Sequence, residues 1–258
     1  MADGETGTRP GETGEPPLSG QDILTIWELG QDRHDADRAL LMLTAGYPER
    51  SWEELVRLSI GARDTLLIRL RARQLGGRIP VAMQCPSCQE RLEFDTSAEE
   101  LLSSVPAPPP ETVEFEVAGL RLRARPLDSR DLAALPAGLS RAEGRRHLVR
   151  RALLEAWSET TPISADALPA EAVTALAERL AEADPGADLE FALNCPGCRH
   201  AWVAIFDITA YFWGELTALA RATLEDVHLL ASAYGWAEAD ILEMSRARRR
   251  YYLSRINP

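Results

Sequence analysis

All four cysteines of the chain lie in two short turns that share the same spacing. Cys85 and Cys88 fall in the stretch QCPSC, and Cys195 and Cys198 fall in the stretch NCPGC. A C-x-x-C turn presents two thiolates toward one point, and tetrahedral zinc takes four such ligands at about 2.3 Å. Each turn supplies only half of that set. We therefore interpret the four cysteines as the ligands of one structural Zn²⁺ ion, held by two turns that residues 89–194 separate.

Three other interpretations of the cysteines stay open at this point. A dithiol redox pair would sit at a helix N-terminus, which lowers the thiol pKa, whereas strand-like residues follow both turns. A two-metal arrangement would use His200 near the second turn, but the first turn offers only Gln89 and Glu90 there. The cysteines could also pack as small apolar side chains. Because four thiolates leave no position for water, the zinc interpretation predicts a site that stabilises and does not catalyse.

No other segment shows a recognised catalytic motif. The chain contains no G-x-S-x-G, Walker A or G-x-G-x-x-G pattern. His34, His147 and His228 fall in or beside predicted helices, without a cysteine or carboxylate partner in a catalytic pattern. The sequence therefore predicts a protein that is not an enzyme.

Composition and charge limit the partners and the compartment. The 258 residues carry a net charge of −12, which opposes binding to nucleic acid or an anionic membrane, since both gain affinity from basic residues. All 28 basic residues are arginine, which is typical of a GC-rich bacterial genome. The apolar runs are shorter than the roughly 18 residues of a membrane span, and the polar N-terminus does not resemble a secretory signal. We expect a cytoplasmic bacterial protein.

Apolar periodicity predicts helices before the first cysteine turn and after the second. Residues 22–75 contain three or four predicted helical segments, with Gly30 and Gly46 as C-terminal stops. Ser51 and Glu54 have the spacing of a capping box. After the second turn we expect a helix of about seven turns, ended by a glycine, and then two short helices.

Alternating apolar residues predict β-hairpins around each cysteine turn, at 78–95 and 188–207, and a third hairpin at 113–125. The two cysteine segments form a weak internal duplication in which Phe94 aligns with Phe206. Helices are predicted at 128–134, at 141–157 and, once or twice, within 164–184.

The predicted fold class is mainly α (α+β), with helical N- and C-terminal layers joined by a split zinc ribbon of short β-hairpins. A small β-hairpin and helical insertion interrupts the ribbon. In chain order the expected parts are a disordered acidic tail (1–20), an N-terminal helical region (21–77), a first zinc knuckle (78–104), the insertion (105–187), a second zinc knuckle (188–207) and a C-terminal helical region (208–258).

The last predicted helix concentrates basic charge in RARRRYY, residues 246–252. Two kinds of partner fit such a stretch: RNA or another phosphate-bearing molecule, and an acidic protein. The first would make the chain a zinc-ribbon nucleic-acid-binding or regulatory protein. The second would make it a protein that docks to other proteins.

Three stretches together resemble one known family. They are LSIGARDTLLIRLRARQLGG at 58–77, the two CPxC turns, and VHLLASAYGWAEADILEMSRARRRYYL at 227–253. These stretches resemble the T-even phage baseplate hub assembly proteins or chaperones, which occur in the gene clusters of contractile, phage-tail-like injection systems. The resemblance implies a role in building or completing a baseplate. Its implied partners are hub, baseplate or other tail-like particle proteins, and its implied location is the cytoplasm or the contractile particle.

Overall fold

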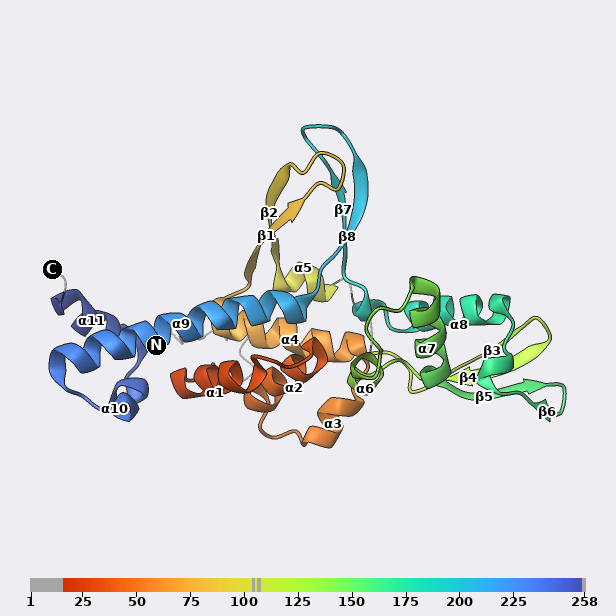
Figure 1. Ribbon diagram of the computed structural model, residues 1–258, viewed down its shortest axis with the longest axis horizontal. Helices are drawn as coiled ribbons and strands as arrows, with labels where there is room; N and C mark the ends of the chain where they lie inside the picture. Colours follow the sequence, from red (N-terminus) through yellow and green to blue (C-terminus); the bar gives the residue numbers. More distant parts are fainter. Residues whose placement is uncertain (1–15, 104, 106–107, 257–258) are drawn as a thin grey trace, which may run out of the picture.

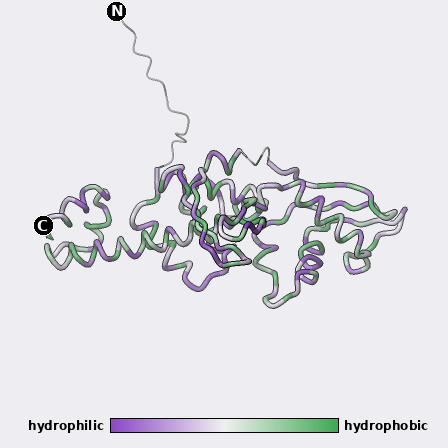
Figure 2. Tube along the Cα trace, turned by 90° about the horizontal axis from the view of Figure 1, so that it is seen from above, coloured by the Kyte–Doolittle hydropathy of each residue, from purple (hydrophilic) through white to green (hydrophobic). Residues whose placement is uncertain are grey.

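The computed structural model describes residues 16–103, 105 and 108–256, and the molecule is elongated along one axis (Figure 1). A layer of helices forms its middle, and two β-hairpins project from this layer. A separate sheet with its helices lies at one end, and two short helices gather around the end of the longest helix at the other. Figure 2 shows hydrophilic and hydrophobic residues alternating along the helices, as expected where each helix buries one face.

The central layer consists of four N-terminal helices and one long helix. These are α1 (Gly20–Gly30), α2 (Asp35–Gly46), α3 (Trp52–Arg57), α4 (Ile60–Leu75) and α9 (Ile208–Tyr234). Leu43 of α2, Leu67 of α4 and Phe212 of α9 are fully buried in the core between them. The predicted capping box of α3 is confirmed. The Ser51 hydroxyl accepts a hydrogen bond from the Glu54 amide, and the Ser51 amide donates one to the Glu54 carboxylate.

Helices α1 and α2 do end at the two glycines predicted as their stops, but not through a left-handed glycine cap. Gly30 and Gly46 are the last residues of α1 and α2, and neither has a positive φ. A Cβ on Gly30 would lie 2.6 Å from Cζ3 of Trp213, and a Cβ on Gly46 would lie 2.6 Å from Cδ1 of Leu70. Neighbouring side chains, and not the backbone conformation, therefore require glycine there. Gly235 does end α9 as predicted, with a φ of +68°.

Ordered structure begins earlier than the sequence indicates. Residues 1–15 of the predicted tail lie outside the described residues, but the prediction of disorder is wrong for 16–20. Leu18 is buried, and its amide donates to Oε1 of Gln74 at 2.8 Å. Ser19 caps α1 in a capping box. One apolar residue within a polar, proline-rich stretch anchors this segment, and its local composition hides that contact.

Two antiparallel hairpins project side by side from the central layer (Figure 1). The first pairs β1 (Arg78–Gln84) with β2 (Arg91–Ser97), and the second pairs β7 (Glu190–Asn194) with β8 (Ala201–Ile205). Helix α5 (Ala98–Ser103) follows β2, and α9 follows β8. Both predicted hairpins around the cysteine turns are thus confirmed.

Most of the chain between the two hairpins forms a unit with its own core. Its elements are β3 (Val113–Val117), β4 (Leu120–Ala124), α6 (Ser129–Ala133), α7 (Arg141–Ala152), β5 (Leu153–Ser158), β6 (Thr161–Pro162), a 3₁₀ turn at Ala165–Ala167, α8 (Ala170–Ala183) and a 3₁₀ turn at Pro185–Ala187. The strands form one antiparallel sheet in the order β3-β4-β5-β6. Leu122 of β4 and Leu176 of α8 are fully buried in a core separate from that of the central layer.

The hairpin predicted at 113–125 is confirmed, but the helix predicted at 141–157 is wrong in its last part. Helix α7 ends at Ala152, and Leu153–Ser158 form β5, which pairs with β4. The pairing with a distant strand outweighs the local preference of this stretch, which contains two leucines and an alanine.

The C-terminal end consists of α10 (Glu238–Glu243) and α11 (Arg246–Ile256), both packed on α9. Both were expected from the sequence. The molecule as a whole combines a majority of helices with small antiparallel hairpins, and its four cysteines cluster. The predicted fold class, mainly α within α+β, is therefore confirmed.

Candidate metal centre

The two cysteine turns have the same backbone geometry. In the first turn the Cys85 amide donates to the Glu90 carbonyl, and the Gln89 amide donates to the Cys85 carbonyl, both at 2.9 Å. Gln89 has a φ of +64°, in the left-handed region that non-glycine residues seldom occupy. These bonds close a tight loop that turns the side chains of Cys85 and Cys88 toward the same side.

The second turn repeats each of these features at the aligned positions. The Cys195 amide donates to the His200 carbonyl, and the Arg199 amide donates to the Cys195 carbonyl, again both at 2.9 Å. Arg199 has a φ of +62°. The weak duplication in the sequence therefore corresponds to two equivalent two-ligand loops.

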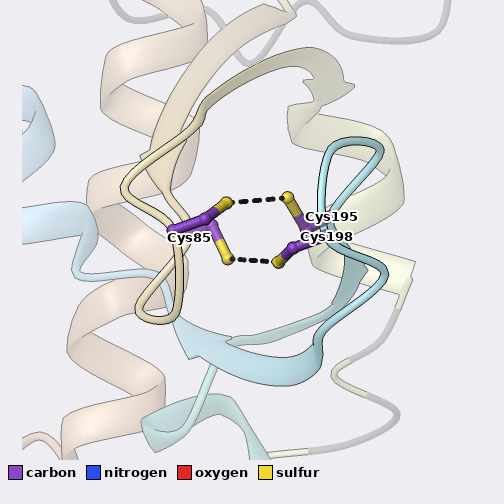
Figure 3. A group of neighbouring side chains, drawn as sticks. Cys85, Cys195 and Cys198 are labelled. Atoms are coloured by element: carbon purple, nitrogen blue, oxygen red, sulfur yellow. Dashed lines mark hydrogen bonds between the residues drawn. The ribbon is translucent and has the colours of Figure 1, made fainter.

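The tips of the hairpins bring the two loops face to face (Figure 3). The Sγ atoms of Cys88 and Cys195 are 3.5 Å apart, those of Cys85 and Cys198 are 3.7 Å apart, and all four sulfurs lie within 4.8 Å of one another. Four sulfurs at about 2.3 Å from one ion stand about 3.8 Å apart in a tetrahedron. The cysteines are free thiols, and these spacings are well beyond the roughly 2.05 Å of a disulfide. The arrangement is compatible with one four-coordinate metal ion.

The neighbouring thiols act on the protonation of Cys88. The amide of Glu90 lowers the pKa of the Cys88 thiol, but the thiols of Cys198, Cys195 and Cys85 raise it, and the result is about 12. Hydrogen bonds to the neighbouring thiols therefore favour the protonated form of Cys88. A divalent cation has the opposite effect, because it deprotonates the thiols that coordinate it.

The geometry that a redox dithiol requires is not found at these turns. Strands β2 and β8 follow the two cysteine pairs, so neither pair lies at a helix N-terminus that would lower a thiol pKa. The raised pKa of Cys88 also argues against a redox dithiol, whose reactive thiol has a lowered pKa.

Cys85 and Cys195 are buried, while Cys88 and Cys198 are exposed. The outer pair is the side from which an ion would reach the cluster.

The histidines do not join the cluster. Among the described residues, the group able to hold a metal consists of the four cysteines alone. His200 is exposed, and its ring stacks 6.1 Å from that of Trp202. His34 accepts a backbone amide at Nδ1 and caps α2, His147 is half-buried in α7, and His228 is exposed on α9. The arrangement with a second metal at His200 has no set of neighbouring ligands in the described part of the chain.

Comparison with known protein families, curated proteins and solved structures finds no match to this chain. Within residues 16–103, 105 and 108–256, no helix combines the length and the apolar content needed to cross a bilayer.

Aromatic contacts that the sequence analysis missed support the hairpins below the sulfur cluster. Phe191 of β7 lies against Phe94 of β2, and the hydroxyl of Tyr211, in the first turn of α9, donates to the Pro80 carbonyl at 2.7 Å. An aromatic residue in each cysteine segment was visible in the sequence, but the contact joins two segments far apart in the chain. The alignment of Phe94 with Phe206 does not extend to structural equivalence, because Phe94 lies within β2 whereas Phe206 follows β8.

Proposed function

We propose that the protein is a non-enzymatic assembly protein that acts by docking to other proteins. One structural Zn²⁺ ion stabilises its fold. The observation that carries the proposal is the approach of four sulfurs within 4.8 Å from two turns distant in sequence. Structural zinc contributes on the order of 10 kcal/mol to the folding of small domains. Bound here, the ion fixes the first hairpin against the second. Its shell is closed by four thiolates, so it stabilises and does not catalyse.

The proposed place of action is the baseplate of a contractile, phage-tail-like injection system, as an assembly or chaperone-like factor. The support for this part is the resemblance of residues 58–77 and 227–253 to the hub assembly family. In the structure the first stretch covers α4, and the second covers the end of α9 with α10 and most of α11. The proposed partners are hub, baseplate or other tail-like particle proteins, met in the bacterial cytoplasm or in the particle.

The metal part of the proposal is tested by metal analysis of the purified full-length protein. We expect one zinc per chain, loss of the zinc in Cys88→Ser, and retention in Ser87→Ala, which changes an exposed residue of the same turn. A four-cysteine iron site would be coloured, whereas a zinc site does not absorb visible light. Protein that carries iron, or that is folded and free of metal after purification without chelator, would contradict the zinc assignment.

The assembly part is tested by recovering the tagged protein from its native host and identifying what binds to it. Zinc is quantified in the same sample. Recovery of hub, tail-tube or spike proteins supports the proposal. Recovery of polymerase or ribosomal components alone would replace the docking role with a nucleic-acid-linked one.

A further inference from the structure

The last helix carries a basic surface, and four of its five arginines make no ion pair within the described part of the chain. α11 contains five arginines and no acidic residue. Arg246, Arg248, Arg250 and Arg255 are exposed, and none of them forms an ion pair with another described residue. We call these four residues, together with the exposed Tyr251, the α11 patch.

The fifth arginine holds the helix in a fixed orientation. Arg249 is buried, with its Nε 3.6 Å from Oδ2 of Asp226 on α9 and its Nη1 donating to the Met244 carbonyl. It also packs against the start of α1, because a Cβ on Gly20 would lie 3.3 Å from Nη1 of Arg249. The inner face of α11 is thus occupied within the chain, and the patch is held on the outer face.

Aromatic contacts steady the patch further. The rings of Tyr252 and Trp236 pack edge to face with centroids 4.8 Å apart, which ties α11 to the segment after α9. Tyr251 remains 55% exposed. Nη2 of Arg255 donates to its hydroxyl at 3.3 Å, and the guanidinium lies 5.1 Å from the ring centroid. Arginine and tyrosine held on a rigid surface are the residue types that dominate binding energy in protein interfaces.

The surroundings of the patch favour a compact acidic partner over an extended polyanion. An 11-residue helix is only about 16 Å long. Carboxylates stand on the adjoining elements, with Asp226 on α9 and Glu238, Asp240 and Glu243 on α10. A nucleic acid that ran beyond α11 would meet these groups and a chain of net charge −12. A protein surface with one acidic cluster would meet the arginines alone.

We propose that the α11 patch is the docking site for an acidic surface of a partner protein. This inference deepens the proposed docking function and rests on it. The four exposed guanidiniums supply charge complementarity and orientation, and Tyr251 supplies an apolar and directional contact at the centre.

The test uses the full-length, metal-loaded protein and two labelled probes short enough to lie along α11: polyglutamate of about six residues and oligouridylate of about six nucleotides. Binding is measured by fluorescence anisotropy at low and at moderate salt. We expect polyglutamate to bind, and R246Q/R248Q/R250Q to weaken it by about tenfold at low salt. The matched control is R141Q/R145Q/R146Q, which removes three exposed arginines of α7 and should leave the affinity within about twofold.

Circular dichroism of each variant checks that the helices are intact. R248Q/R255Q is a second variant of the patch, and it should also weaken polyglutamate binding. It leaves Arg246 and Arg250 in place, because the charges of these two residues act on Asp226 of α9. Equal losses of polyglutamate affinity in the α7 and α11 triple variants would overturn the proposed docking site, because they would show that binding responds to net charge alone. Tighter binding of oligouridylate than of polyglutamate would overturn the protein-partner assignment.

The patch and the proposed function fail in distinguishable ways. If the wild-type protein and R246Q/R248Q/R250Q recover hub subunits from the native host equally well, the patch is wrong and the assembly role stands. If the wild-type protein recovers no tail-like particle protein while polyglutamate still binds at α11, the baseplate assignment is wrong and the patch stands.

Discussion

The ring of Phe94 on β2 meets the ring of Phe191 on β7 edge to face, with centroids 5.1 Å apart and planes at 83°. Phe191 also lies 5.6 Å from Phe206, which follows β8. Aromatic pairs of this kind contribute about 0.5–1.5 kcal/mol beyond the area they bury. The two hairpins are therefore joined twice, by the sulfurs at their tips and by these rings closer to the central layer.

Metal removal should consequently loosen the tips more than the bases of the hairpins. We expect chelation to raise hydrogen exchange at residues 84–91 and 194–201, because the sulfurs no longer share an ion. The paired segments 78–82 and 190–193 should stay protected in the wild-type protein. In Phe191→Ala, chelation should expose these segments too. Hydrogen exchange measured by mass spectrometry tests this prediction. Uniform loss of protection along both hairpins of the chelated wild-type protein would show that the phenylalanine rings do not hold the bases of the hairpins together.

Arg71 and Glu215 form a nearly buried ion pair that ties α4 to α9. Two N–O contacts of 2.7 and 3.0 Å join them, and the Arg71 side chain is 3% exposed. Breaking a buried pair leaves a charge without its partner, so Glu215→Gln should lower the free energy of unfolding by about 3 kcal/mol. Urea denaturation measures this. The control is Glu53→Gln, in an exposed pair with Arg57, which should change it by less than about 0.5 kcal/mol. Equal effects would refute the special role of the buried pair.

Gly30→Ala should destabilise the protein although it places a better helix former in α1. An alanine within a helix gains up to about 1 kcal/mol over glycine, but here its Cβ collides with the ring of Trp213. We expect a net loss of about 1–3 kcal/mol and a change in tryptophan fluorescence. Trp213→Phe shortens the ring and should reduce the cost of Gly30→Ala in the double variant. If Gly30→Ala lowers the free energy of unfolding equally in the wild type and in Trp213→Phe, a contact other than Trp213 requires glycine at position 30.

Asp64 should make stability fall as the pH rises through about 6. Burial raises its pKa to about 6 despite the guanidinium of Arg63, 2.7 Å away. The unfolded chain has a pKa near 3.9, so the native state holds the extra proton between these values. The contribution of Asp64 is complete below about pH 4 and is lost as the pH passes about 6.

Asp64→Asn removes this titration. The difference in unfolding free energy between wild type and variant should therefore shift against the wild type by on the order of 2–3 kcal/mol from about pH 4 to about pH 7. Urea denaturation of both proteins across this range tests the sign. Parallel profiles would mean that the pKa of Asp64 does not differ between the native and the unfolded chain.

The cysteine cluster could be anticipated because its evidence is local. Each C-x-x-C turn indicates a two-ligand loop, and the alternating apolar residues beside it indicate a hairpin. Because a tetrahedral site needs four ligands, two such loops in one chain predict a shared site. The capping box at Ser51 and the end of α9 at Gly235 depend on residues within a few positions of one another.

The features that could not be anticipated depend on contacts between distant segments. Strand β5 forms because β4 lies beside it, and its own residues suit a helix equally well. Leu18 is buried by partners far along the chain, and Arg249 is turned inward by Asp226 while its neighbours face solvent. Periodicity within α11 does not distinguish that arginine from the other four, so its anchoring role became visible only in three dimensions.

The distance between the two cysteine turns along the chain also sets an order of events at the ribosome. At about 5–20 residues per second, synthesis of residues 89–194 takes roughly 5–20 s. Throughout that interval the nascent chain displays one thiol pair whose complement has not been made. The intervening unit, which has its own core, has time to fold before the second pair emerges. Capture of the proposed ion can thus begin only after the second pair has been made, and a chain truncated anywhere before residue 198 lacks one or more of the four cysteines.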